Sequence, residues 1–255
     1  MGVTGESGRA IERARVIGIP VDNIRYDDLS EAVDCMTRRK KPSQIAFVRS
    51  WDILRARHSK TYREALEQCA LVIPVAKGIV RSARFLGYGD VARHLPFQFV
   101  VRLLSVLEEK GGSVFLLGST PSRLSRVEQN IRETFPRVRI VGRHEGGFSE
   151  GAGKNILLAI RKAAPSLLLT GRGIRKGDLW LYFHQLQLPG SIAIWSGESF
   201  DIMSGRRRPA SQRAFAGGRE DLGYLIKRPW RGLRFFGYLW FGLLLLFFRL
   251  FRSGH

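Results

Sequence analysis

Short apolar runs of strand length recur along the chain, separated by stretches whose apolar residues have helical spacing. The runs cover Gln44–Val48, Ala70–Ile73, Val114–Leu117, Arg139–Val141, Leu167–Thr170 and Ile192–Trp195. The clearest helical stretch carries Leu124, Val127, Ile131 and Phe135, which recur every three or four residues as one buried stripe requires. Strands that alternate with helices of this length predict a single α/β domain with a mostly parallel central sheet flanked by helices.

The pattern changes near Arg206, where the chain becomes basic and then apolar. Residues 206–255 hold eleven Lys or Arg against two acids. Within them, Phe235–Phe248 is a run of fourteen residues without a charge, with arginines on both sides. A helix of this length spans about 21 Å, less than the roughly 30 Å hydrocarbon core of a bilayer. We therefore expect a basic, amphipathic or apolar segment that lies in the membrane interface; a membrane-spanning helix and a buried core helix are the alternatives.

These patterns divide the chain into three parts. Residues 1–15 are polar and lack the apolar core of a signal peptide, so we expect a disordered N-terminal tail on a protein that stays in the cytosol. Residues 16–205 are expected to form the α/β domain, and residues 206–255 a basic membrane-associating appendage. Cys35 and Cys69 show no metal-site spacing, and we expect both to be buried thiols.

The charge of the chain predicts anionic partners. Its net charge is +20, from 42 Lys and Arg against 22 Asp and Glu. Nucleic acid, an acidic membrane surface and phosphorylated small molecules all fit this charge. The uncharged C-terminal run favours a membrane surface over nucleic acid, which would instead need basic residues interleaved with exposed aromatic ones.

Three of the predicted strands end in glycine-containing turns. The turns are Gly118–Pro121, Gly171–Gly173 and Ser196–Ser199. Ligands of open α/β sheets collect at the carboxyl ends of the strands, and the free N–H groups of a following helix suit phosphate. Arg172, Arg175 and Lys176 would add positive charge to the second turn. The turns predict a nucleotide or sugar-phosphate site, with plain structural turns as the alternative.

Absent and present motifs limit the classes of reaction that the sequence supports. The chain has no Gly-x-Gly-x-x-Gly fingerprint, no P-loop, no Gly-x-Ser-x-Gly elbow and no Asp-x-Asp pair. These absences argue against NAD, ATP and hydrolase chemistry and against a metal held through Asp-x-Asp. His144 and Glu145 could transfer a proton, although a solvated loop above Phe148 explains them as well. For Asp201, a helix cap is a simpler explanation than a ligand contact.

The order of these motifs resembles the WecG/TagA/CpsF glycosyltransferases (glycosyltransferase family 26), from about Val16 to about Tyr238. The similarity is clearest in Gly112–Phe148. There a strand, Leu-Leu-Gly, a helix ending in Phe-Pro, a second strand and a His-x-Gly-x-Phe turn follow in the family order. The other matching segments are Gly171-x-Gly173 with Lys176, Ser199–Asp201 with Gly205, and Arg207–Pro209.

The resemblance implies a hexosyltransferase that works without a metal or another cofactor. Such enzymes move an N-acetylhexosamine-type sugar from a UDP-sugar to a polyprenyl-diphosphate-linked acceptor, such as one on undecaprenyl diphosphate, in cell-surface polysaccharide biosynthesis. The resemblance also implies a peripheral protein at the cytoplasmic face of the bacterial cell membrane, held to anionic lipid by its C-terminal tail. Nucleic acid is not an expected partner, and self-association into a homo-oligomer is left open.

By the same resemblance, two groups of residues would bind the two substrates. Those that would bind the nucleotide-sugar are Gly118, Gly171, Gly173 and Lys176. Those that would bind the lipid diphosphate are Arg93, Arg207 and Arg208.

The sequence departs from the family at its reactive edge. The family's Pro-Asp-Gly turn, whose Asp is the proposed general base, aligns with Pro74–Ala76, so that Val75 replaces the acid. The family's Thr-x-Asn aligns with Val48–Ser50, and its Thr-Gly-x-Asp with Leu95–Gln98. Valine cannot accept a proton, so the catalytic residue stays unassigned. The carboxylates considered as substitutes are Asp52, Asp90 and Glu145. The alternative function is a catalytically inactive relative that binds a nucleotide-sugar or a lipid-linked glycan as a scaffold or regulator.

Overall fold

The computed structural model describes residues 11–39, 41–210 and 234–252 of the chain. The strands are β1 (Glu12–Val16), β2 (Ile19–Asn23), β3 (Ser43–Val48), β4 (Leu71–Pro74), β5 (Ser113–Leu117), β6 (Arg139–His144), β7 (Leu167–Thr170) and β8 (Ile192–Trp195). The helices are α1 (Leu29–Thr37), α2 (Ser50–His58), α3 (Lys60–Gln68), α4 (Lys77–Phe85), α5 (Pro96–Glu109), α6 (Pro121–Thr134), α7 (Glu150–Ala163), α8 (Asp178–His184), α9 (Gly197–Met203) and α12 (Arg234–Arg252). The predicted tail up to residue 10 and residues 211–233 of the predicted appendage lie outside the described residues.

A six-stranded parallel sheet forms the centre of the molecule. Its strand order is β4-β3-β8-β7-β5-β6, and every neighbouring pair runs parallel. Each connection between parallel strands passes through helices, which cover both faces of the sheet. The predicted α/β class is confirmed, and β7 and β8 have the predicted bounds.

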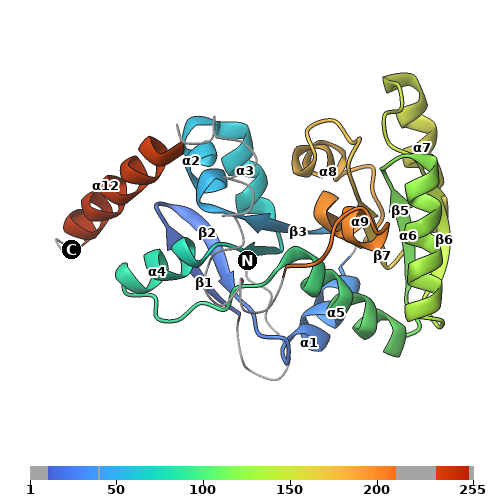
Figure 1. The fold of residues 1–255 in the computed structure, drawn as a ribbon, viewed down its shortest axis with the longest axis horizontal. Helices are drawn as coiled ribbons and strands as arrows, with labels where there is room; N and C mark the ends of the chain where they lie inside the picture. The colour runs from blue at the N-terminus through green and yellow to red at the C-terminus, as the bar shows by residue number, and fades with distance from the viewer. Residues whose placement is uncertain (1–10, 40, 211–233, 253–255) are drawn as a thin grey trace.

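Alternate side chains of each strand point to opposite faces of the sheet and enter different cores. On one face, Ile45 and Leu169 pack with α1, α5, α6 and α9. On the other face, Val72 packs with α2, α3, β1 and β2, while Phe115 and Leu168 pack with α7 and α8. Figure 1 shows α2 and α3 on one side of β3, and α1 and α5 on the other. The sheet is therefore apolar on both faces, as its continuous apolar runs predict.

The antiparallel hairpin β1–β2 was not expected from the sequence. Its two-residue turn, Ile17 and Gly18, has positive φ at both positions (53° and 78°), as a type I′ turn requires. Isoleucine is unusual there, because β-branched residues seldom adopt positive φ. Ala14 and Val16 are buried. For residues 12–15 the structure thus replaces the expected tail with a strand.

The helix α12 packs against α2 and α4 at the end of the molecule opposite α7 (Figure 1). Phe241 and Leu244 are buried in this contact. The guanidinium of Arg249 lies 4.3 Å from the ring centroid of Phe85 on α4. Among the described residues, no helix combines the length and the apolarity that a membrane span needs.

Both cysteines are free thiols. Cys69 is buried as predicted, and burial raises the pKa of its thiol. Cys35 is only half-buried, at the margin of the core that α1 and α5 share.

Candidate functional site

The loops that follow β5, β6 and β7 are joined by backbone hydrogen bonds at the carboxyl edge of the sheet. The N–H group of Gly118 donates to the carbonyl of His144 at 2.8 Å, and that of Ser119 to the carbonyl of Arg172 at 2.6 Å. The N–H group of Gly147 donates to the carbonyl of Gly173 at 2.8 Å. The structure therefore brings Gly118 and Gly173, two of the predicted nucleotide-binding glycines, into one group of loops joined by backbone hydrogen bonds.

Close packing explains why glycine is needed in these loops. A Cβ on Gly118 would lie 2.9 Å from the carbonyl oxygen of Arg172, and a Cβ on Gly171 would lie 2.6 Å from the ring of Phe200. The N–H group of Gly171 also donates to the carbonyl of Leu117 at 2.8 Å. The N–H groups of Gly118 and Gly171 thus already have protein acceptors. Their predicted contact with a nucleotide diphosphate stays a prediction.

Lys176 lies in the turn between β7 and α8, away from the strand ends themselves. Its backbone is left-handed, with φ of 62°. Its ammonium group lies 5.2 Å from the ring centroid of Phe183 on α8. The side chain is therefore held over an exposed aromatic ring in this structure.

Arginines and carboxylates gather at the carboxyl ends of β3, β7 and β8. We call this group the arginine–carboxylate cluster, and its members are Arg49, Arg172, Glu198, Asp201, Arg206 and Arg207. Arg49 follows β3, and Arg172 follows β7. The two acids lie on α9, which follows β8. The cluster forms because three neighbouring strands end at the same edge of the sheet.

Glu198 bridges two arginines of the cluster. One carboxylate oxygen, Oε2, accepts a hydrogen bond from Nη2 of Arg49 at 3.1 Å. The other, Oε1, lies 3.5 Å from Nη1 of Arg207. The Glu198 side chain is 15% exposed, whereas those of Arg49 and Arg207 are 40% and 28% exposed. The two arginine side chains are therefore more exposed than the glutamate side chain with which they pair.

Asp201, one helical turn further along α9, forms a second bridge. Its Oδ2 accepts from Nε of Arg172 at 2.7 Å, and its Oδ1 lies 3.6 Å from Nη1 of Arg206. Asp201 was expected to cap a helix, but the N-cap of α9 is Ser196, and Asp201 is an ion-pair partner instead. The cluster thus joins four guanidiniums and two carboxylates, and the carboxylate of Asp52, which accepts the N–H group of Arg49 at 2.9 Å, lies beside it.

The end of β4 carries no carboxylate. Val75 is 1% exposed, and its N–H group donates to the carbonyl of Val48 on the neighbouring strand at 2.9 Å. The N–H group of His94 donates to the carbonyl of Pro74 at 3.1 Å, which places the adjacent Arg93 beside this strand end. Burial lowers the pKa of the His94 imidazole. The structure thus brings Arg207 into the arginine–carboxylate cluster and Arg93 to the end of β4, and Arg208 is exposed.

His144 and Glu145 form the loop after β6. The His144 ring packs edge-on against Phe148, with 5.8 Å between ring centroids, and Phe148 packs in turn against Trp180 of α8. This is the arrangement expected of an exposed loop above a packed aromatic ring. Among the described residues, no group of three or more His, Cys, Asp or Glu side chains could hold a metal ion.

Sequence reasoning missed the parts of the cluster contributed by Arg49 and Glu198. Arg49 directly follows a predicted strand, and Glu198 lies in one of the predicted strand-end turns. The signal that could have found them is the rule that parallel strands end at a common edge. Applied to charged residues as well as glycines, the rule places both at that edge.

Comparison with known proteins adds to this geometry. The model of the Glycosyl transferase WecG/TagA/CpsF family matches residues 14–254. A Bacillus subtilis (strain 168) protein named N-acetylglucosaminyldiphosphoundecaprenol N-acetyl-beta-D-mannosaminyltransferase is 22% identical over 220 residues, which cover 84% of this chain and 85% of the relative. A Staphylococcus aureus (strain NCTC 8325 / PS 47) protein of the same name is 18% identical over 211 residues, which cover 82% of each chain. Because the family match spans nearly the whole chain, this protein belongs to the WecG/TagA/CpsF glycosyl transferase family.

Proposed function

We propose that this chain is a glycosyltransferase that moves an N-acetylhexosamine-type sugar from a UDP-sugar to a polyprenyl-diphosphate-linked acceptor in cell-surface polysaccharide biosynthesis. The observation that supports the proposal most is the arginine–carboxylate cluster, found in a chain that belongs to this family. Its arginines lie at the carboxyl edge of the sheet, where ligands of α/β sheets bind. A UDP-sugar and a lipid-linked acceptor both carry a diphosphate, which guanidinium groups bind well.

In this proposal the two ends of the sheet edge have different tasks. The tightly packed loops with Gly118, Gly171 and Gly173 form the nucleotide-sugar side of this edge, and Lys176 adds positive charge from the turn before α8. Arg93, Arg207 and Arg208 hold the lipid diphosphate. During transfer the acceptor hydroxyl loses a proton as its oxygen bonds to the sugar carbon and UDP departs. The group that takes this proton is unassigned.

A second candidate function is favoured by Val75. Val75 occupies the position where our alignment places the family's proposed base. Its aliphatic side chain is buried and has no group that could accept a proton. If that base is indispensable, its loss costs about 10²–10⁴-fold in rate. The chain would then be an inactive relative that binds nucleotide-sugar or lipid-linked glycan as a scaffold or regulator.

Calorimetric titration of the full chain in mild detergent with UDP, UDP-N-acetylmannosamine, UMP and ATP tests the proposal. We expect UDP and UDP-N-acetylmannosamine to bind selectively, since the arginines of the cluster and Lys176 favour a diphosphate over UMP. Turnover with a lipid-linked acceptor then separates the two candidates, because the inactive relative binds without turnover. Failure of every uridine nucleotide to bind at millimolar concentration would contradict the glycosyltransferase and would leave the inactive relative only as a binder of lipid-linked glycan.

We further propose that α12 holds the protein at the cytoplasmic face of the membrane as a peripheral protein. The face of α12 turned away from α2 and α4 carries large apolar side chains that are 52–58% exposed. They are Trp240, Leu243, Leu246 and Phe247. An exposed apolar stripe flanked by basic residues is typical of helices that lie in the interface of an anionic membrane. The exposed apolar stripe and the opposite side with Phe241, which packs against α2 and α4, together explain why α12 is apolar on all sides.

Replacing Leu243 and Phe247 together by glutamate should weaken sedimentation with anionic phosphatidylglycerol vesicles by at least about tenfold, because the double change removes two large apolar contacts with lipid and adds repulsion. Point substitutions suit this test better than deletion of α12, which would uncover the apolar surface beneath Phe241. The matched control is Leu158→Glu on α7, a leucine that is 50% exposed at the opposite end of the molecule. Equal vesicle binding by the double variant and the control would exclude the stripe as the anchor.

A further inference from the structure

We propose that Glu198 is an exchangeable internal counter-ion, whose place between Arg49 and Arg207 is taken by a phosphate group when a diphosphate ligand binds. This inference rests on the proposed function only for the identity of the ligand, because the exchange itself requires only a diphosphate. It gives a task to Arg49 and Glu198, which the proposed binding residues do not include.

The geometry of the Glu198 bridge resembles that of a bound anion. A carboxylate presents two oxygens to two guanidiniums, one to each, at 3.1 and 3.5 Å. A phosphate group presents the same kind of oxygen pair with more charge, and arginine forks bind both groups through charge-assisted hydrogen bonds. Since the side chains of Arg49 and Arg207 are more exposed than that of Glu198, a ligand can reach the two arginines from solvent while Glu198 is still in place.

The two bridges of the cluster differ in how easily they can exchange. Asp201 is held by a 2.7 Å hydrogen bond from Arg172, and its backbone carbonyl accepts the N–H group of Arg207 at 3.0 Å. The shorter ion pair of Glu198, at 3.1 Å, is longer than the bond between Asp201 and Arg172, and the Glu198 side chain has one more rotatable bond with which to swing away. Asp201 therefore fixes the backbone beside Arg207, while Glu198 occupies the position that a ligand can take.

The exchange predicts that the Glu198 carboxylate competes with the ligand. Removing its charge should strengthen diphosphate binding, and removing an arginine should weaken it. Two opposite unit charges at about 4 Å attract each other in water and more strongly near a protein surface, so we expect about a tenfold change in affinity in each direction.

The test is calorimetric titration of the full chain with inorganic pyrophosphate and, separately, with UDP. Glu198→Gln should bind pyrophosphate about tenfold more tightly than the unmodified chain, and Arg49→Gln about tenfold more weakly. Glu198→Asp keeps the charge on a shorter side chain that cannot span both arginines, and should fall between the unmodified chain and Glu198→Gln. Thermal unfolding of each variant verifies that it is folded.

The chain offers a matched control in Glu128 on α6. Its carboxylate also bridges two arginines, Arg132 at 2.8 Å and Arg143 at 2.6 Å, and its side chain is 18% exposed. Glu128→Gln removes the same kind of bridge away from the cluster and should leave pyrophosphate affinity unchanged.

The outcomes separate this inference from the proposed function. Tighter pyrophosphate binding by Glu198→Gln without UDP binding by any variant would support the exchange and contradict the glycosyltransferase. UDP binding that does not change between the unmodified chain and Glu198→Gln would support a nucleotide site elsewhere on the sheet edge. If pyrophosphate binding also did not change between these two chains, the exchange would be overturned. Equal effects of Glu198→Gln and Glu128→Gln, or no pyrophosphate binding by any variant, would also overturn it.

Discussion

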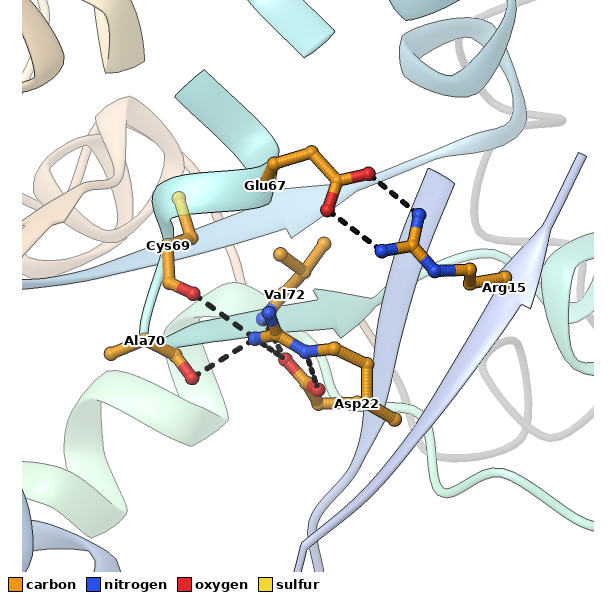
Figure 2. A network of polar contacts seen from close by, with 7 residues as sticks. Arg15, Asp22, Glu67, Cys69, Ala70 and Val72 are labelled. Atoms are coloured by element: carbon orange, nitrogen blue, oxygen red, sulfur yellow. Dashed lines mark hydrogen bonds and ion pairs between the residues drawn. The ribbon is translucent and has the colours of Figure 1, made fainter. Parts of the chain in front are cut away.

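Replacing Asp22 by alanine should lower the free energy of unfolding by about 3–5 kcal/mol, because it leaves a largely buried guanidinium and a buried N–H group without their partner. Asp22 is 1% exposed and lies on β2 directly opposite Arg13 on β1. Its Oδ1 accepts from Nε of Arg13 at 2.7 Å, and its Oδ2 accepts from the N–H group of Val72 at 2.6 Å (Figure 2).

This network protects the open edge of the central sheet. β4 is an edge strand, and the N–H group of Val72 would otherwise have no partner in the described part of the sheet. Arg13 Nη2 also donates to the carbonyls of Cys69 and Ala70, at 3.0 and 3.2 Å. Burial alone would lower the pKa of the Arg13 guanidinium, but the pairing with Asp22 more than offsets this and raises it. The Arg13–Asp22 ion pair therefore holds the hairpin against β4 and provides a partner for the N–H group of Val72 at the edge of the sheet.

Urea unfolding at pH 7 checks this prediction, with Glu67→Ala as the control. Glu67 pairs with Arg15 at 2.7 Å in the same region of Figure 2, but the two side chains are 33% and 51% exposed. A surface pair of this kind contributes about 0–1 kcal/mol. If Asp22→Ala costs no more than Glu67→Ala, the network around Asp22 does not stabilise the fold as we expect.

The sequence predicts the central sheet well because both of its faces are buried. A strand covered on both sides needs a continuous apolar run, and such runs stand out between polar segments. β6 extends beyond its predicted end, through the polar residues Gly142–His144, because it is an edge strand and alternates between exposed and half-buried positions. The hairpin escaped prediction because Arg13 and Asp22 look like surface residues until their partners on β4 are known.

The location of the candidate site was predictable, whereas its charge arrangement was not. Three glycine turns after predicted strands indicate the carboxyl edge, and the structure gathers Gly118 and Gly173 there. The bridge between Arg49 and Glu198 joins residues 149 positions apart. A single arginine or glutamate in a sequence usually belongs to a solvated surface, so only the strand order reveals that these two meet.

Replacing Asp178 by asparagine should stabilise the chain at pH 8 by up to about 4 kcal/mol and have little effect near pH 4. Asp178 begins α8, and its Oδ1 is buried without a hydrogen-bond partner. Burial, followed by the negative charge of Asp52, raises the pKa of this carboxyl from 3.8 to about 7, although Arg55 opposes the shift. Asparagine has nearly the same shape and no charge to bury.

The sign of the effect follows from where the proton is bound. In the unfolded chain the carboxyl loses its proton near pH 4, whereas the folded chain keeps the proton until about pH 7. The unmodified chain therefore loses stability as the pH rises from 4 to 7, and Asp178→Asn does not share this loss. Asp52→Asn, which keeps an oxygen for the N–H group of Arg49, should reduce the same pH dependence in part. Urea unfolding at pH 4.5, 6 and 8 measures all three chains. A difference between the unmodified chain and Asp178→Asn that stays constant over this range would mean that Asp178 is already ionised in the folded chain at pH 4.5, held by a partner that offsets its burial.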